Sequence, residues 1–277
     1  MHPPILLKPR SSVQLSSRTA LHPAECARRL LRELNVQAIP IQPRAIAEKL
    51  QIVVWEREME RRYDGCLMRV GEVWGILLNS LIQSQPRKNF TIAHELGHYH
   101  LDGGQTKQHR CLREDLRGFG SHQLDEQRAN QFAVELLMPA PIFQADANEI
   151  PEVGLSAIDA LAAKYSTSLT STAIRYIRLS QHVCAIVFSE NGRIKYFAYS
   201  KGFRRNCDCY LVKDKPLHPH SLARLLTERK SKEIEDMQGE VPLSYWCSTN
   251  SDGIIIEHSR RLPRMNQILS FLWLPSP

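Results

Sequence analysis

The sequence predicts an α+β protein, because stretches with helical and with strand character follow one another along its 277 residues. In PAECARRLLRELNV the apolar residues Cys26, Leu30, Leu31 and Leu34 recur at the spacing of an amphipathic helix. Two other segments are rich in β-forming residues and indicate hairpins. Hydrophobic residues make up 43% of the chain, and no window nears the roughly eighteen uninterrupted apolar residues of a membrane span. We therefore expect a folded core and no membrane segment.

The first half of the chain is expected to alternate helices with one hairpin. Residues 1–20 predict a flexible tail, since they lack the long apolar core and cleavage site of a signal peptide. A second helix is expected in PRAIAEKLQI, followed by the extended segment IVVWE, and DGCLMRVGEVWGILLNS reads as a hairpin around Gly71. The helix FTIAHELGHYHL comes next, then a polar loop from about 103 to 122. The helix in LDEQRANQFAVELLMP should end at Met138, because Pro139 disfavours helical geometry in the residue before it.

A change of composition after this helix suggests a boundary near residue 150. The stretch PAPIFQADANEIPEVG carries three prolines. Two short helices are expected between Ser156 and Leu179, then a hairpin whose Asn191-Gly192 pair supplies positive φ values. HPHSLARLLTERK should be helical, and VPLSYWC and GIIIEHS strand-like. The end of the chain is therefore expected to be a mixed α/β unit.

The cysteine content favours a cytoplasmic location, whereas the net charge does not identify a binding partner. The net charge of +7 fits an acidic partner such as nucleic acid, but the Lys and Arg residues form no dominant run and also fit an ordinary solvated surface. The seven cysteines are odd in number and scattered, which favours a reducing cytoplasm. Cys207 and Cys209 have no matching second pair and supply only half of a metal site.

The segment FTIAHELGHYHL places metal-binding chemistry on one helix. His94 and His98 are four residues apart, so at about 100° per residue both imidazoles lie on nearly the same face. Neutral imidazole is a good ligand for zinc. Glu95 lies beside the first histidine, where it can reach a water held by the metal and act as a general base. His100 and Asp102 read as a polar helix end, and His109 as solvated.

Catalytic zinc sites usually take a third protein ligand, and Glu126 is the favoured candidate. On the second helix Glu126 continues a stripe of small residues that would let the two helices approach closely, and Gly97 removes bulk on the first helix. Burying a glutamate beside such an apolar face destabilises the fold unless another group compensates its charge. Asn130, one turn further on, can hydrogen-bond and orient a ligand.

The other acids of that helix are expected to face solvent. Asp125 points about 100° away from Glu126, and Glu135 about 180° away.

The sequence RKNFTIAHELGHYHLDG, followed after a polar gap by EQRANQFAVELLMP, closely resembles the ImmA/IrrE family of metallopeptidases. The shared pattern is an Arg and a Phe before HExxH, then E-x-x-A-N-x-F-A-x-x-L-L-M-P. These proteins are cytoplasmic zincins of bacteria and phages with glutamate as third ligand. The resemblance implies that His94, His98 and Glu126 bind Zn²⁺, with Mn²⁺ as an alternative, and that Glu95 is the catalytic base. It is clearest from about Ser80 to Pro139.

The resemblance also implies a fold and a substrate class. A minimal zincin would have a small twisted sheet packed on the two motif helices, with VWGILLN as the edge strand that holds an extended peptide. A separate oxyanion donor is expected, with Tyr99 and His122 as candidates. Family members typically cleave a repressor that has its own helix-turn-helix, here taken as an XRE-type repressor, and so induce DNA-damage or mobile-element genes.

The second half of the chain resembles known modules less closely. LAAKYSTSLTSTAIRYIRL, residues 161–179, resembles a helix-turn-helix with Arg175 and Arg178 on its second helix, although Ser166 stands where Gly is favoured at the turn. The same segment would also fit a helical pair packed on the peptidase core, with these residues buried: Ile158, Leu161, Ala162, Ile174 and Ile177. The last hundred or so residues resemble, by element order only, the GAF-like sensor domain of longer radiation-response members. A stabilising or partner-binding domain is the alternative for them.

Together these features predict a cytoplasmic, zinc-dependent endopeptidase that inactivates a transcriptional repressor. Its expected parts are a tail (1–20), a zinc metallopeptidase domain (21–150), a helical helix-turn-helix-like region (151–181) and a mixed α/β GAF-like domain (182–277). The alternative is a DNA-binding or protein-binding transcriptional regulator with a non-catalytic metal site and weak nucleic-acid contact. The sequence leaves the oligomeric state open.

Overall fold

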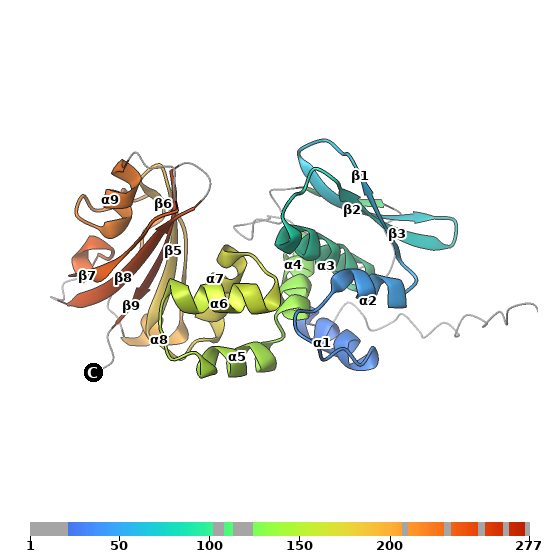
Figure 1. Cartoon of the computed structure of the whole chain (residues 1–277), viewed down its shortest axis with the longest axis horizontal. Helices are drawn as coiled ribbons and strands as arrows, with labels where there is room; N and C mark the ends of the chain where they lie inside the picture. The colour runs from blue at the N-terminus through green and yellow to red at the C-terminus, as the bar shows by residue number, and fades with distance from the viewer. Residues whose placement is uncertain are drawn as a thin grey trace, which may run out of the picture.

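A computed structural model describes residues 22–101, 108–112, 124–206, 210–229, 234–248, 253–262 and 266–274, and the structural statements below concern these residues. The molecule is elongated (Figure 1). A first sheet with its helices lies at one end, further helices form the middle, and a second sheet lies at the other end. The predicted tail 1–20 falls outside the described residues.

The first sheet has four strands in the order β1-β3-β2-β4. β1 runs parallel to β3, and the other neighbours are antiparallel. The hairpin predicted around Gly71 is confirmed, with Val70 opposite Val73 and Gly71 at φ 62°. The elements of this half are α1 (Pro23–Glu33), α2 (Pro43–Lys49), β1 (Val53–Arg57), β2 (Tyr63–Val70), β3 (Val73–Asn79), α3 (Gln85–Leu101), β4 (Gln108–Leu112) and α4 (Leu124–Leu137).

Two predictions for this sheet are wrong. VWGILLN forms β3, which lies inside the sheet, so the described edges are β1 and β4. The predicted polar loop contains β4, which pairs with β2. A short strand of mixed polarity such as QHRCL gains its hydrogen bonds from a distant partner and carries no clear local signal.

Helices α3 and α4 pack closely because small residues face each other. A Cβ atom added to Gly97 would lie 3.0 Å from the Cα atom of Ala129 and 3.1 Å from its carbonyl oxygen. Since those are backbone atoms, they cannot rotate away. The expected close approach of the two motif helices at Gly97 is therefore confirmed.

The middle of the molecule consists of α5 (Ala140–Glu149), α6 (Leu155–Tyr165) and α7 (Leu169–Leu179). The sequence did not predict α5, because its prolines suggested a boundary. Pro139 and Pro141 occupy the cap and the first turn, where proline is compatible with a helix, and Phe143 is fully buried. Between α6 and α7, Ser166 adopts the left-handed conformation with φ 52°.

A buried ion pair ties the end of α4 to α7. Arg175 donates to Glu135 Oε2 at 2.5 Å and to the carbonyl oxygen of Met138, and Arg28 of α1 reaches Glu135 Oε1 at 2.9 Å. The expectation that Glu135 faces solvent is therefore wrong, because partners from two other helices compensate its charge. Arg175 is only 9% exposed. Of the two arginines proposed for DNA contact, Arg175 is therefore buried and Arg178 is exposed.

The second sheet is antiparallel, in the order β6-β5-β9-β8-β7. Asn191 (φ 52°) and Gly192 (φ 71°) form the predicted tight turn. The segment VPLSYWC is only partly a strand, because η3 turns Trp246 into the core, where its Nε1 donates to Glu257 at 2.9 Å. The elements are β5 (Cys184–Glu190), β6 (Arg193–Tyr199), α8 (Lys201–Asn206), α9 (Leu222–Glu228), β7 (Asp236–Pro242), the 3₁₀ helix η3 (Leu243–Tyr245), β8 (Ile254–Arg261) and β9 (Gln267–Trp273).

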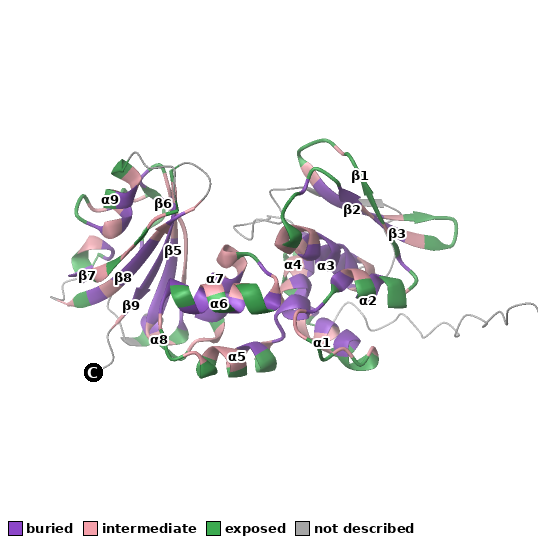
Figure 2. Cartoon of the chain, in the orientation of Figure 1, coloured by how far each residue is buried: buried purple, intermediate pink, exposed green. Residues whose placement is uncertain are grey.

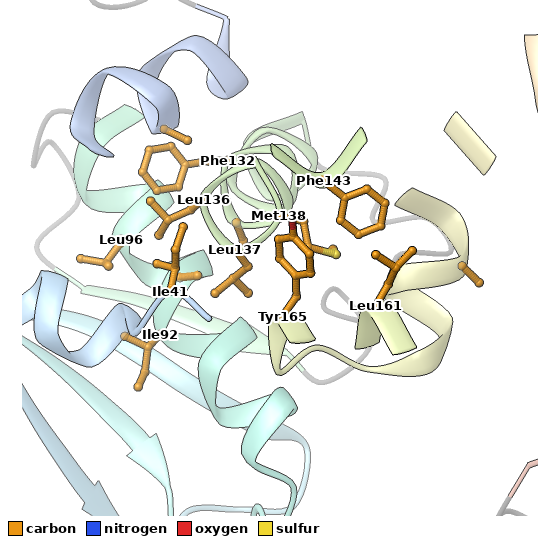
Figure 3. Packing of buried hydrophobic residues seen from close by; sticks show 14 of the residues in the cluster. Ile41, Ile92, Leu96, Phe132, Leu136, Leu137, Met138, Phe143, Leu161 and Tyr165 are labelled. Atoms are coloured by element: carbon orange, nitrogen blue, oxygen red, sulfur yellow. The ribbon is translucent and has the colours of Figure 1, made fainter. Parts of the chain in front are cut away.

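One continuous apolar cluster joins these parts. Buried residues cover the inner faces of the helices and the centre of the second sheet (Figure 2). The end of α4 lies between Ile41, Ile92 and Leu96 on one side and Phe143, Leu161 and Tyr165 on the other (Figure 3). The same cluster includes Phe271 and Trp273 of β9. A second cluster fills the space between the second sheet and α9.

Among the described residues, no helix is both long and apolar enough to cross a membrane. The thiol of Cys184 is free, and Cys247 is disulfide-bonded. The cytoplasmic location inferred from the scattered cysteines stays a prediction.

Candidate metal centre

The two motif helices bring three ionisable side chains to one buried point. His94 and His98 come from α3, and Glu126 comes from the first turn of α4. One ligand atom from each of the three lies within 4.8 Å of the others, and all three residues are buried. The helical spacing that predicted this convergence therefore corresponds to the geometry observed.

The individual distances show how tightly these groups meet. The Nε2 atoms of His94 and His98 are 3.0 Å apart. Glu126 Oε2 lies 3.1 Å from Nε2 of His94, and its Oε1 lies 3.5 Å from Nε2 of His98. Two imidazole nitrogens and a carboxylate are all electron-pair donors when the histidines are neutral. A cation is the group that satisfies such a set.

Asn130 fixes the tautomer of His94. Its Oδ1 atom lies 3.0 Å from Nδ1 of His94, and a carbonyl oxygen can only accept, so Nδ1 carries the proton. In a neutral ring this leaves the lone pair on Nε2, which faces His98 and Glu126. Burial lowers the pKa of His94, and the hydrogen bond that a protonated ring would donate to Glu126 only partly offsets that effect. The neutral, metal-binding form of His94 is therefore favoured.

Glu95 lies on the side of α3 that faces β2. It is fully buried, and a Cβ atom added to Gly65 would come 3.2 Å from its Oε1 atom. The same atom would meet Cγ2 of Thr91 at 2.5 Å, so the strand backbone lies directly against this part of the helix. The sequence did not single out Gly65, because nothing local to a strand glycine reveals which helix it meets.

An ion pair between a half-buried arginine and a buried carboxylate, next to Gly65, was also missed. Arg87 donates from Nε to Asp64 Oδ2 at 2.6 Å and from Nη2 to Oδ1 at 2.5 Å, and Asp64 is fully buried. The available signal was the arginine that precedes the HExxH motif. Its acidic partner, 23 residues earlier on a strand, could not be inferred from helical spacing.

The other residues named from the sequence do not join the three candidate metal ligands. Asp125 is exposed, as expected. The rings of Trp74 and His100 lie edge-on to Tyr99, with centroids 5.4 and 5.2 Å away, and His100 also stacks on Phe132. The following lie outside the described side chains: Asp102, His109, His122, Cys207 and Cys209.

The donor set fits a borderline-soft divalent ion. Two imidazoles and one carboxylate are a ligand combination found in catalytic zinc sites, which keep a further position open. The buried carboxylate of Glu126 also compensates the charge of such an ion. Among the described residues these three form the group that could hold a metal.

Comparisons with known proteins concern the fold and the family of the chain. No curated protein sequence matches the chain. A Mycobacterium tuberculosis transcriptional regulator of known structure is similar in fold, with a TM-score of 0.54 and 12% identity over 92% of this chain and 77% of that chain. The family model of the IrrE N-terminal-like domain, peptidase M78, matches residues 47–176, which include both motif helices. Residues 47–176 of this chain are therefore an IrrE N-terminal-like domain of the M78 peptidase family.

Proposed function

We propose that this chain is a zinc-dependent endopeptidase that hydrolyses a peptide bond in a transcriptional repressor. The observation that carries the proposal is the convergence of His94, His98 and Glu126 within 4.8 Å. Glu95 follows the first of these residues on the same helix, and the whole group lies inside a domain of the M78 peptidase family.

The proposed roles follow from the position of each side chain. A divalent ion bound by the three ligands would supply Lewis-acid polarisation of a water molecule and of the scissile carbonyl. Glu95 accepts the proton of the attacking water and delivers it to the leaving nitrogen. Asn130 holds His94 with Nε2 unprotonated and the ring fixed in orientation. The close packing of α3 on α4 at Gly97 keeps Glu126 within reach of both histidines.

Zinc is the proposed native metal, and manganese is the alternative. Imidazole ligands favour zinc, whereas carboxylate-rich sites favour manganese. Metal analysis of protein purified without added metal would distinguish the two. An ion other than these would contradict this part of the proposal.

Metal binding is expected to persist to lower pH than free imidazole would allow. Metal ions bind neutral imidazole, and burial holds the pKa of His94 below its ordinary value of 6.5. Protons therefore compete at His94 only once the pH falls below that value. Zinc affinity, measured by competition with a fluorescent chelator, should be nearly constant from about pH 8 to about pH 6.5 and fall below it. A tenfold loss between about pH 8 and pH 7 would contradict this expectation.

The proposed substrate is a repressor that carries an XRE-type helix-turn-helix. The family resemblance supports this class, and cleavage would induce DNA-damage or mobile-element genes. We place the reaction in the cytoplasm, where such a repressor works. Within this proposal the helices α6 and α7 form the helix-turn-helix-like region, and residues 182–277 form the GAF-like sensor domain.

Co-expression with the repressor encoded next to this gene tests the proposal. Wild-type protein should cut the repressor at one site. Glu126→Ala should leave it whole, because only two ligands remain and two histidines bind metal weakly. Asp125→Asn is the matched control, since it changes an exposed acid next in sequence and should cut as wild type does. An intact repressor in the presence of metal-loaded wild-type protein would contradict the proposal.

The alternative is a DNA-binding or protein-binding regulator with a non-catalytic metal site. The fold shared with a transcriptional regulator and the net charge of +7 favour it. The burial of Arg175 against Glu135 weakens it, because that arginine cannot reach phosphate. Gel shifts with duplex DNA over a range of salt concentrations would discriminate, since true binding weakens steeply as salt rises.

A further inference from the structure

Strand β2 carries a bulge at the point where it crosses α3. Tyr63 pairs with Leu112 of β4 and Gly65 pairs with Cys111, so Asp64 is an extra residue between two consecutive partners. A bulge redirects a side chain, and bulges are frequent beside active sites. Here the redirected side chain is the fully buried carboxylate that holds Arg87.

The face of α3 that meets this bulge leads to Glu95. Arg87, Thr91 and Glu95 are each four residues apart and therefore lie one above another on the helix. Thr91 donates to the carbonyl oxygen of Arg87 at 2.9 Å. Along β2, Asp64 meets Arg87, while the next residue, Gly65, lies against both Thr91 and Glu95.

We propose that Asp64, Arg87 and Gly65 are positioning residues that hold the carboxylate of Glu95 in place for catalysis. The inference rests on the proposed function, because it assigns these residues to the general base of that reaction. Arg87 donates two hydrogen bonds to the carboxylate of Asp64. Together they fix the position of β2 both along the axis of α3 and across it, which a single hydrogen bond would not do. The backbone of Gly65 then fits over Glu95, where an added Cβ atom would lie 3.2 Å from Oε1 and crowd the carboxylate. General-base catalysis tolerates little displacement, since an error of about 1 Å can cost about a hundredfold in rate.

The test uses Co²⁺-loaded protein with acetohydroxamate as the probe. This small acid chelates a metal ion through two oxygens and forms a charge-assisted hydrogen bond with a correctly placed neighbouring carboxylate. Its affinity, read from the visible spectrum of Co²⁺, reports the position of Glu95 without any peptide substrate. Gly65→Ala and Arg87→Lys should each weaken acetohydroxamate about tenfold, as Glu95→Gln should, while Co²⁺ affinity stays within about twofold of wild type.

Control variants distinguish a displaced Glu95 carboxylate from a general loss of folding. Gly239→Ala adds a Cβ at ordinary contact distance, 3.7 Å from Leu222, and Arg69→Lys alters an exposed pair on the same strand. Both should bind acetohydroxamate as wild type does. If Gly65→Ala folds poorly, adding Thr91→Ser removes the Cγ2 atom that would lie 2.5 Å away and leaves the contact with Glu95. That double variant should fold and still bind the probe weakly.

Repressor cleavage supplies a second readout. The two variants should lower kcat by about ten- to a hundredfold and leave KM unchanged. Unchanged acetohydroxamate affinity in Gly65→Ala, or an equal loss of Co²⁺ affinity, would overturn the inference and leave the proposed function standing. A wild-type protein that binds no Co²⁺ would overturn the proposed function itself, and the positioning role with it.

Discussion

Glu95→Gln should lower kcat for repressor cleavage by about 10²- to 10⁴-fold while the protein keeps its metal. Glutamine fills the same space but cannot take a proton from water. The three residues that would hold the metal are unchanged, and Glu95 is not one of them. Metal content by elemental analysis and single-turnover cleavage would measure the two effects separately.

The informative comparison is with Glu126→Ala, which should lose both the metal and the activity. A Glu95→Gln variant that cleaves at more than about a tenth of the wild-type rate would remove Glu95 from the chemistry. A variant that loses its metal would instead show that Glu95 is a ligand.

Glu135→Ala should cost about 3–5 kcal/mol of unfolding free energy, which is large for a single substitution. The change leaves Arg175 without its carboxylate partner in a site that is 9% exposed, and burial already lowers the pKa of this guanidinium. It also removes an acceptor for the backbone N–H group of Ala140 and for Arg28. Urea unfolding followed by circular dichroism would measure the loss.

Glu33→Ala is the matched control. Glu33 pairs with Arg29 on the exposed side of α1, where solvent screens an ion pair and its contribution to stability is small. A Glu135→Ala variant no less stable than this control would mean that the buried pair contributes little. The double variant Glu135→Met and Arg175→Met should lose less than the sum of the single changes, because no charge of the pair then remains unmatched.

Local patterns were sufficient to predict the helices of the candidate metal centre. Residues four apart on a helix must share a face, so the pairing of His94 with His98 follows from the backbone alone. Glu126 could be chosen among several acids because its neighbours on one stripe are small. The family resemblance then added the roles, and the match over residues 47–176 supports the same family.

Interactions between segments distant in sequence were not predictable in this way. The sequence predicts a solvent-facing Glu135 because this residue points away from Glu126 on the helix, whereas Arg175 and Arg28 approach it from other helices. β3 looked like an edge strand because its partners β1 and β2 cannot be ordered from sequence. The pair Asp64 and Arg87 depends on a bulge, and a bulge is set by the register between two strands.

The shared cluster that joins α1 to β9 bears on synthesis at the ribosome. Phe271 and Trp273 of β9 complete a core that Leu30 and Ile92 begin much earlier in the sequence. That core can close only after β9 has left the ribosome. A product of early termination would therefore keep bare apolar surface, which cellular quality control recognises.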